Sequence, residues 1–194
     1  MTFKNKYNKH TYPPSDDSLL MVDTINKQKK RWNHALDMGT GTGIIAYHLS
    51  KKTNKVTAID INPHAIKSAQ KNLKNIKNIE IKQSDLFSQI KQTKYDLITF
   101  NPPYIPIEKP ELKNSEIEKA WNGGKTGRKT INKFITQSKN HLTKNGSILL
   151  LTSSITNPKK IKNKAKKQGF KTKTINKKEI FFETLEIIQL TQNS

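Results

Sequence analysis

Strand-like and helix-like segments alternate along almost the whole chain, and this alternation restricts the fold more than any other feature of the sequence. Short runs of β-branched residues and leucine are separated by amphipathic stretches of roughly 10–15 residues. The expected strands are 34–38, 55–60, 79–83, 95–100 and 147–153, the expected helices are 43–51, 63–74, 127–142 and 158–168, and the tail 170–191 holds two more strands in an antiparallel pair. The sequence therefore predicts an α/β fold, a mainly parallel seven-stranded sheet with helices on both faces.

One more helix is expected near the start of the chain. Ser15 can cap it, and Asp16 and Asp17 occupy its first turn, where the positive end of a helix favours carboxylates. Neither a repeat nor a domain-scale linker interrupts the sequence. All 194 residues are therefore predicted to form a single domain, with 1–31 as an amino-terminal segment and helix and 32–194 as the core.

The chain carries a formal net charge of +21, from 36 lysines and arginines against 15 aspartates and glutamates. A surplus of this size favours polyanionic surroundings such as RNA or a ribosome. Lysine, asparagine and isoleucine are abundant together throughout, however, and an AT-rich genome would also produce that composition. The charge is compatible with an RNA-associated setting and does not identify a substrate.

Cysteine is absent, which excludes disulfides, thiolate zinc sites and a cysteine nucleophile. No apolar run approaches the ~20 residues of a membrane-spanning helix. The polar, basic start lacks the apolar segment of a secretory signal. We therefore expect a cytoplasmic protein with no membrane association and no metal site of its own.

A glycine-rich turn, Asp-Met-Gly-Thr-Gly-Thr-Gly at 37–43, joins the first core strand to the next helix. Gly39 and Gly41 permit a tight turn and let a ligand approach the backbone at a helix N-terminus. The third glycine stands one place earlier than in the dinucleotide fingerprint. Asp37 would repel a pyrophosphate but suits an ammonium group. The turn favours a zwitterionic, sulfonium-bearing ligand over a dinucleotide, with a purely structural turn as the alternative.

Two carboxylates follow the next two expected strands. Asp60 stands about 20 residues after the glycines, where an acidic side chain can accept hydrogen bonds from ribose hydroxyls, although a lone aspartate there more often caps the following helix. Asp85 could accept a hydrogen bond from an adenine amino group, with Leu86 packing near the ring, and an ordinary turn aspartate is the alternative. Because the carboxyl ends of parallel strands line one crevice, both are predicted to face the same ligand.

The most specific motif is the turn Asn101-Pro102-Pro103-Tyr104, directly after the strand 95–100. The two prolines stiffen it, so that holding groups in place costs little entropy. The Asn101 side-chain carbonyl and the Pro102 backbone carbonyl can accept both hydrogens of an NH₂ group and aim its nitrogen at a methyl donor. Tyr104 supplies a flat face for a planar amide or base. The alternative is an ordinary proline turn.

Taken in this order, these motifs resemble those of class I S-adenosylmethionine-dependent methyltransferases that modify NH₂ groups. The closer resemblance is to the HemK-related protein glutamine methyltransferases, and two flanking motifs carry it. Residues 12–20 (Tyr-Pro-Pro-Ser-Asp-Asp-Ser-Leu-Leu) resemble that family's first motif, with Asp16 and Ser18 in place of the more usual glutamate and threonine. Residues 120–128 (Ala-Trp-Asn-Gly-Gly-Lys-Thr-Gly-Arg) resemble the glycine-rich segment after its catalytic turn. The length resembles the archaeal and eukaryotic branch, which lacks the amino-terminal helical domain of the bacterial release-factor enzymes.

The resemblance implies a Rossmann-like fold, S-adenosylmethionine as cofactor, and a role for each motif. For the cofactor, it implies that the methionine end contacts Asp37, Gly39 and Gly41 with Ser18 nearby, that Asp60 binds the ribose, and that Asp85 and Leu86 frame the adenine. It also implies that Asn101, Pro102, Pro103 and Tyr104 form the acceptor-binding turn. Within that turn Asn101, Pro102 and Tyr104 are the catalytic residues, and Asn101 contacts the cofactor as well. The family's usual acceptor is the glutamine amide in the Gly-Gly-Gln loop of a peptide-chain release factor. Members of this branch are similar in needing a small zinc-ribbon activator subunit.

Two other functions stay open. One is methylation of an exocyclic amine of adenine or guanine in RNA or DNA, which the +21 charge would suit, although a base in a duplex would first have to be flipped out. The other is a non-catalytic RNA-binding protein with this fold, using the lysines of 158–168. A lysine side chain is also a candidate acceptor, since it too presents amine hydrogens.

Overall fold

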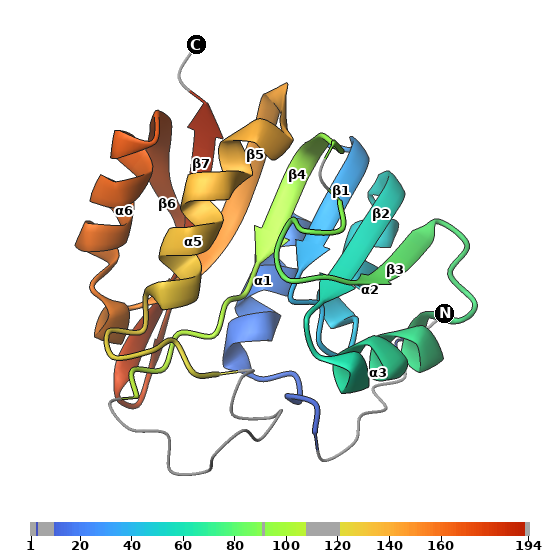
Figure 1. Ribbon diagram of the computed structural model, residues 1–194, viewed down its shortest axis with the longest axis horizontal. Helices are drawn as coiled ribbons and strands as arrows, with labels where there is room; N and C mark the ends of the chain where they lie inside the picture. Colours follow the sequence, from blue (N-terminus) through green and yellow to red (C-terminus); the bar gives the residue numbers. More distant parts are fainter. Residues whose placement is uncertain (1–2, 4–9, 91, 108–120, 193–194) are drawn as a thin grey trace.

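The computed structural model describes residues 3, 10–90, 92–107 and 121–192. Seven strands form one sheet in the order β3-β2-β1-β4-β5-β7-β6 (Figure 1). The strands are β1 (Trp32–Met38), β2 (Thr53–Asp60), β3 (Ile79–Gln83), β4 (Tyr95–Phe100), β5 (Leu142–Ser153), β6 (Phe170–Ile180) and β7 (Glu183–Gln192). Strands β1 to β5 run parallel, whereas β7 is antiparallel to β5 and to β6. The predicted mainly parallel seven-stranded sheet with an antiparallel carboxyl-terminal hairpin is confirmed.

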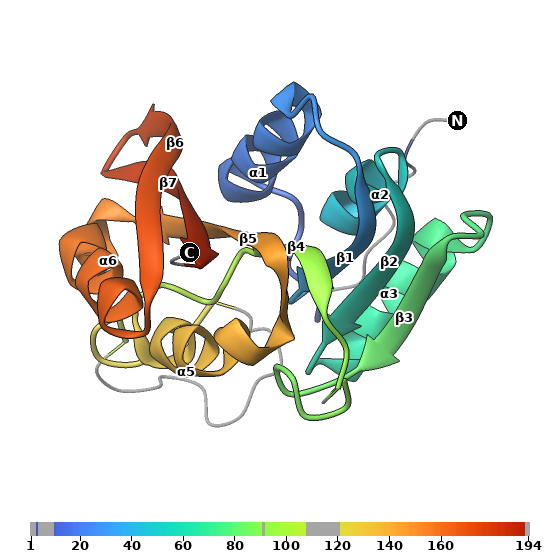
Figure 2. The ribbon, with the colours of Figure 1, turned by 90° about the horizontal axis from the view of Figure 1, so that it is seen from above.

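Helices cover both faces of this sheet, as predicted. They are α1 (Asp16–Lys27), α2 (Ile44–Ser50), α3 (Pro63–Leu73), α5 (Lys129–Ser138) and α6 (Pro158–Lys167), with 3-10 turns η1 (Lys139–His141) and η2 (Ser154–Thr156). Seen from above, α1 and α2 lie on one face and α5 and α6 on the other (Figure 2). None of the described helices is long and apolar enough to cross a membrane.

The central strands are buried on both sides, which explains their nearly continuous apolar sequences. In β4, Leu97, Ile98 and Phe100 are each at most 2% exposed. Strand β3, at the edge of the sheet, has only half-buried or exposed residues. The core therefore lies around β1, β4 and β5.

The helix expected over 127–142 is shorter in the structure. It spans only α5, a 3-10 turn follows, and β5 begins at Leu142, five residues earlier than predicted. Leu142 is 1% exposed and pairs with Tyr95 of β4, while the Thr143 hydroxyl donates to Asp96 Oδ1 at 2.9 Å. Pairing with β4, which no local pattern reveals, draws these residues into the sheet.

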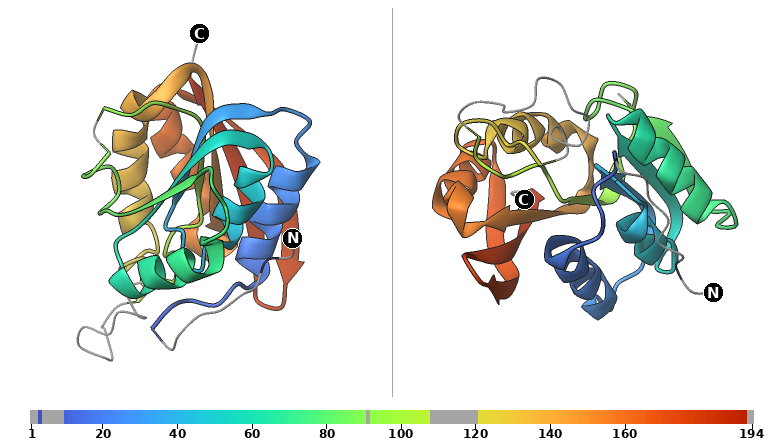
Figure 3. Two further views of the ribbon diagram at one scale, coloured as in Figure 1. Left: turned by 90° about the vertical axis from the view of Figure 1, so that its right-hand side faces the viewer. Right: turned by 90° about the horizontal axis from the view of Figure 1, so that it is seen from below.

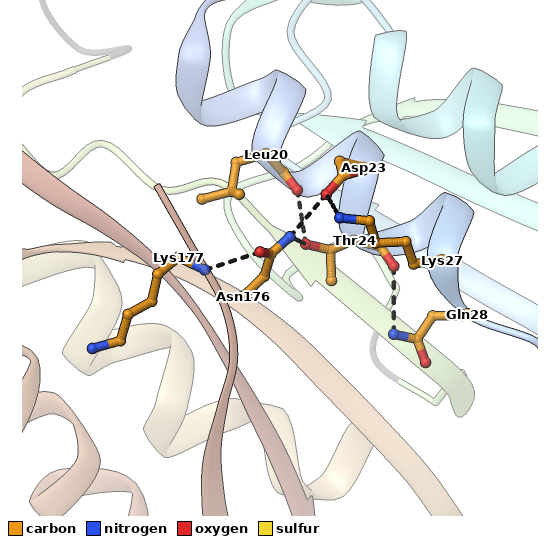
Figure 4. A network of polar contacts seen from close by, with 7 residues as sticks. All are labelled: Leu20, Asp23, Thr24, Lys27, Gln28, Asn176 and Lys177. Carbon is orange, nitrogen blue, oxygen red and sulfur yellow. Dashed lines mark hydrogen bonds and ion pairs between the residues drawn. The ribbon is translucent and has the colours of Figure 1, made fainter. Parts of the chain in front are cut away.

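Helix α1 is attached to the carboxyl-terminal hairpin by a polar network (Figure 4). The Asn176 side-chain amide of β6 donates to Asp23 Oδ2 at 3.0 Å and to Thr24 Oγ1 at 2.9 Å, and the Thr24 hydroxyl donates to the Leu20 carbonyl at 2.7 Å. The side view shows α1 beside the β6–β7 hairpin (Figure 3, left). This packing of α1 on the core supports the single-domain organisation, which stays a prediction.

Candidate active site

A cavity of about 640 Å³ lies at the carboxyl ends of the parallel strands, between the first turn of α1 and the turns after β1, β2, β3 and β4. Its size is typical of a small-molecule or cofactor site. Every site residue predicted from the sequence lines this cavity except Asp37. Parallel strands bring these distant motifs together because all of them end at the same edge of the sheet.

The glycine turn leaves open space on the cavity side. Gly41 has a φ of +54°, and a Cβ at this position would meet no atom within 4 Å. Gly43 has a φ of +87°, and a Cβ there would lie 2.6 Å from Leu73 Cδ1. Gly43 is therefore required by packing against α3, whereas Gly41 keeps the turn open for a ligand next to the backbone.

Asp37 lies beneath the turn and not on the cavity wall. Its side chain is fully buried, and both oxygens accept hydrogen bonds from the chain: Oδ2 from the Thr40 hydroxyl at 2.7 Å and the Ala46 amide at 3.1 Å, and Oδ1 from the Thr99 hydroxyl at 3.0 Å. Asp37 is not among the residues that line the cavity, and its predicted contact with the cofactor stays a prediction. Asp37 supports the turn and the first turn of α2, because its side chain points inward from the end of β1.

Burial raises the pKa of Asp37 from its usual value of 3.8 to about 7, against the lowering effect of the hydrogen bonds from Thr40 and Thr99. The folded state therefore keeps a proton that the unfolded state has released between these two values. This contribution favours folding at low pH and declines as the pH rises from about 4 to about 7, by up to about 4 kcal/mol, since one pKa unit corresponds to about 1.4 kcal/mol.

We expect the variant Asp37→Asn to remove this pH dependence. Measured by urea unfolding from pH 4 to 8, the free energy of unfolding of the wild type should fall relative to that of the variant up to about pH 7 and then level off. A difference between the two proteins that stays constant over the whole range would contradict the raised pKa of Asp37.

Asp60 lines the cavity and can accept further hydrogen bonds. Its Oδ2 accepts from the Gly41 amide at 2.9 Å and its Oδ1 from the Asn62 amide at 2.9 Å, which leaves acceptor sites on both oxygens. Burial raises the pKa of this carboxyl. The capping role is filled by Asn62, whose Oδ1 accepts from the His64 amide of α3 at 2.8 Å. The structure thus leaves Asp60 available for a ligand.

Asp85 and Leu86 follow β3 on the same side of the cavity. The Asp85 carboxylate, 51% exposed, forms an ion pair with the Lys133 ammonium of α5 at 2.8 Å, which the sequence did not indicate. Leu86 is 6% exposed and has a φ of +49°, a backbone conformation that residues other than glycine seldom adopt. Such backbone strain is concentrated at functional sites.

Asn101 offers an unused acceptor. Its side-chain oxygen Oδ1 is buried and has no hydrogen-bond partner in the described part of the chain. Leaving such an atom unsatisfied costs about 1–3 kcal/mol, so buried amide oxygens are nearly always paired. Because Asn101 and the two following prolines line the cavity, a ligand N–H is a suitable donor for this oxygen.

Two tyrosines, the buried Tyr104 and the half-buried Tyr12, and two carboxylates lie at the acceptor turn on the α1 side. Burial, with the negative charges of Asp17 and Glu183, raises the pKa of Tyr104 well above its usual range. Burial and the charge of Asp17 raise the pKa of Tyr12 to about 12. Both hydroxyls therefore stay protonated near neutral pH, so neither tyrosine serves as a base.

Sequence reasoning missed three of these four residues as site residues. Asp17 is 4% exposed and accepts hydrogen bonds from the amide and hydroxyl of Ser18, at 2.5 Å and 3.0 Å, but its sequence position indicated only a favourable helix start. Tyr12 stood in the first motif without a role. Glu183 gave no signal, because only the pairing of β7 with β5 brings it to this edge.

The glycine-rich segment after the turn packs against it. The Ile105 amide donates to the Trp121 carbonyl at 2.9 Å, and the Gly123 amide donates to the Ile105 carbonyl at 2.9 Å. Residues 108–120, among them Ala120 of the flanking motif, lie outside the described part of the chain. The described part of that motif contacts the acceptor turn directly.

Known proteins resemble this chain in sequence and in structure. The family described as methyltransferase small domain matches residues 15–183. A provisionally named protein N5-glutamine methyltransferase of Methanocaldococcus jannaschii is 38% identical over 187 residues, which are 95% of this chain and 93% of that protein. The release factor glutamine methyltransferase of Escherichia coli K12 is 34% identical over 146 residues, which are 71% of this chain and 53% of that protein. The chain thus spans about half the length of this bacterial relative.

A solved structure shows the same fold at somewhat lower identity. It is the E. cuniculi Mtq2–Trm112 complex, described as responsible for methylation of the translation termination factor eRF1. It aligns with a TM-score of 0.77 and 26% identity over 95% of this chain and 99% of that chain. Given the family match over most of its length and the relative of 38% identity, the chain belongs to the methyltransferase small-domain family and, within it, to the HemK-related protein glutamine methyltransferases.

Proposed function

We propose that this chain transfers a methyl group from S-adenosylmethionine to the side-chain amide nitrogen of a glutamine in a peptide-chain release factor. One observation carries the proposal: the buried Asn101 oxygen on the cavity wall has no hydrogen-bond donor among the described residues. A primary amide supplies such a donor, and the Pro102 carbonyl can accept its second hydrogen. The names of the bacterial relatives and the eRF1 methylation described for the Mtq2–Trm112 complex support a release factor as the acceptor.

The residues on the cavity wall fit S-adenosylmethionine. Asp60 retains acceptor capacity for ribose hydroxyls, Leu86 offers an apolar contact for the adenine, and the open turn at Gly41 accommodates the methionine end near Ser18. When bound, the cofactor supplies a sulfonium group, which makes its methyl an activated donor. Asp37 contributes beneath the turn, where it holds the backbone around which the methionine end would bind.

Positioning should dominate the catalysis. The lone pair of an amide nitrogen is delocalised, so the nitrogen reacts only when it is held in line with the donor. Asn101 and Pro102 would fix both hydrogens and the direction of the nitrogen. The carboxylates of Asp17 and Glu183 give this end of the site a negative potential, which stabilises positive charge as it develops on nitrogen.

The main competing acceptor is an exocyclic amine of a nucleobase, which presents the same NH₂ group. Two carboxylates next to the acceptor turn oppose this alternative, because they would repel a phosphate backbone that approaches from the α1 side. The protein acceptor is therefore favoured in spite of the +21 net charge.

A labelling experiment tests the proposed acceptor. The chain is incubated with radiolabelled S-adenosylmethionine and a release factor, either wild type or with the glutamine of its Gly-Gly-Gln motif changed to alanine. We expect the label to enter the wild-type factor only and to be released by protease and not by nuclease. Label that an RNA or DNA substrate takes up and nuclease releases would instead establish the nucleobase function.

Two partners follow from the same proposal. Trm112 accompanies Mtq2 in the related complex, so the labelling is run with and without a small zinc-ribbon activator subunit.

With a release factor as the acceptor, we expect the enzyme in the cytoplasm, where translation takes place. The lysine-rich surface would then favour an encounter near the ribosome, since its charge attracts RNA over long range.

A further inference from the structure

Two adjacent phenylalanines stand fully in solvent at the turn between β6 and β7. Phe181 is 99% exposed and Phe182 is 95% exposed, whereas no other large hydrophobic side chain of the described residues exceeds 55%. Burying one such side chain contributes about 1.5–3 kcal/mol, and neither residue obtains this gain from the described part of the chain. Exposed apolar groups that adjoin each other mark interaction surfaces more often than single ones do.

Hydrogen bonds and an ion pair hold the tip of the hairpin in place, so flexibility of the chain does not account for its exposure. The Ser153 hydroxyl donates to Glu183 Oε2, and the Thr184 amide donates to Ser154 Oγ at 3.0 Å. On the other strand, Lys178 forms an ion pair with Asp16 of α1 at 2.9 Å. Together with the Asn176 network (Figure 4), these contacts fix the tip relative to α1 and β5.

The tip belongs to the same edge of the molecule as the cavity. Glu183, which follows Phe182, is one of the two carboxylates whose charge acts on Tyr104 of the acceptor turn. The turn between β6 and β7 and the start of α1 both lie where the parallel strands end (Figure 1). The other exposed large hydrophobic side chains are also at this edge, on α1 and after β2, β4 and β5: Leu19, Ile61, Ile105 and Ile155.

The charge around the tip indicates the kind of partner. The segment 179–184 contains two carboxylates, Glu179 and Glu183, and no cationic side chain, in a protein whose net charge is +21. The groove beside Glu179 is lined by Lys159, Lys162 and Lys166, and phenylalanines can stack on bases, so a nucleic acid is the competing occupant. A protein surface with an apolar patch fits the tip better, because the tip itself presents two carboxylates and no cationic side chain.

We propose that Phe181 and Phe182 form the docking surface for the folded body of the acceptor protein, while the acceptor side chain enters the cavity beside Asn101. This inference rests on the proposed function and adds to it a specificity determinant outside the cavity. A loop peptide reaches only the cavity, whereas an intact acceptor also covers the tip. Aromatic side chains that become buried in this way commonly carry much of the binding free energy of an interface.

The test compares two substrates with one double variant, Phe181→Ser/Phe182→Ser. We expect KM for the intact release factor to rise on the order of tenfold at an unchanged kcat, because one or two aromatic anchors contribute that much to binding. For a short peptide that spans the glutamine loop, kcat/KM should stay at the wild-type value. The matched control is Lys171→Ser/Lys173→Ser, which changes two exposed residues of β6 away from the tip. In this control, the ratio of kcat/KM for the intact factor to kcat/KM for the peptide should equal that of the wild type.

Each remaining outcome overturns the inference. An equal loss on peptide and intact protein would mean that the tip shapes the cavity itself. An unchanged KM for the intact factor would mean that the acceptor does not touch the tip, and loss of a co-purified activator subunit would assign the tip to that partner. If the wild-type enzyme methylates neither substrate, the proposed function fails and the inference fails with it, a result distinct from an active wild type with an equally active variant.

Discussion

Replacing Asn101 with alanine is expected to lower kcat by about two to three orders of magnitude while the affinity for S-adenosylmethionine changes only slightly. The reason is the position of the Asn101 oxygen, which is buried on the cavity wall and has no partner among the residues that the structure describes. Its removal leaves one hydrogen of the acceptor amide unheld and withdraws a dipole from the developing positive charge. Removal of one such preorganised polar group typically costs about 10²–10³ in kcat.

The matched control for this prediction is Asn132→Ala, the same change on the exposed face of α5. We expect its kcat and its cofactor affinity to equal those of the wild type. Cofactor binding is measured by calorimetry and methyl transfer with the labelled cofactor. If Asn101→Ala keeps more than about a tenth of the wild-type kcat, the acceptor-holding role of Asn101 is wrong.

Replacing Gly127 with alanine is expected to disrupt the acceptor turn, because Gly127 lies against the backbone of Tyr104. Gly127 has a φ of +68°, and a Cβ there would lie 2.2 Å from the Tyr104 carbonyl oxygen and 2.8 Å from Thr156 Cγ2. This steric overlap can be relieved only if the backbone of the acceptor turn moves. We expect the free energy of unfolding to fall by at least about 2 kcal/mol, from backbone strain and steric overlap together, and kcat to fall with it.

A second glycine provides a control that separates the effect of steric overlap from that of left-handed backbone strain. Gly169 has a φ of +83°, but a Cβ there would meet only the flexible end of the Lys139 side chain. Gly169→Ala should cost only the left-handed backbone strain, about 1–2 kcal/mol, and leave kcat unchanged. Urea unfolding and steady-state kinetics of both variants decide the matter, and equal effects of the two changes on kcat would refute the contact between Gly127 and the acceptor turn.

The members of the site were predictable because each motif follows a strand. The glycine turn, Asp60 and the Asn101 turn are all local signals, and a parallel sheet must bring the carboxyl ends of its strands together. The confirmed order of strands and helices made the clustering of these motifs on one cavity a geometric consequence. The separate binding role of each residue stays a prediction until a ligand is measured.

The contacts that the sequence did not reveal share a different origin. Asp37 stands two residues before Gly39 in the chain, yet its side chain points inward to Thr99, 62 residues away. The Asp85–Lys133 ion pair also joins residues distant in sequence, as does the pairing of Leu142 with Tyr95 that shortens α5. Such contacts depend on strand register and helix placement, which hydrophobic periodicity does not encode at the level of single side chains.

The sequence by itself determined the fold class, the family and the turn that holds the acceptor, because these depend on alternating strands and helices and on short motifs with strict local geometry. Only the tertiary structure decided which atoms are free for a ligand. In the described part of the chain, the buried Asp37 accepts hydrogen bonds on both oxygens, Asn62 caps α3 so that Asp60 keeps acceptor capacity on the cavity wall, and Asn101 Oδ1 has no donor. The tertiary structure also brought Glu183 and the exposed tip at Phe181 and Phe182 to the same edge as the cavity. The physical reason is that a hydrogen bond or an exposed surface belongs to the packed chain as a whole, whereas a turn motif belongs to a few consecutive residues.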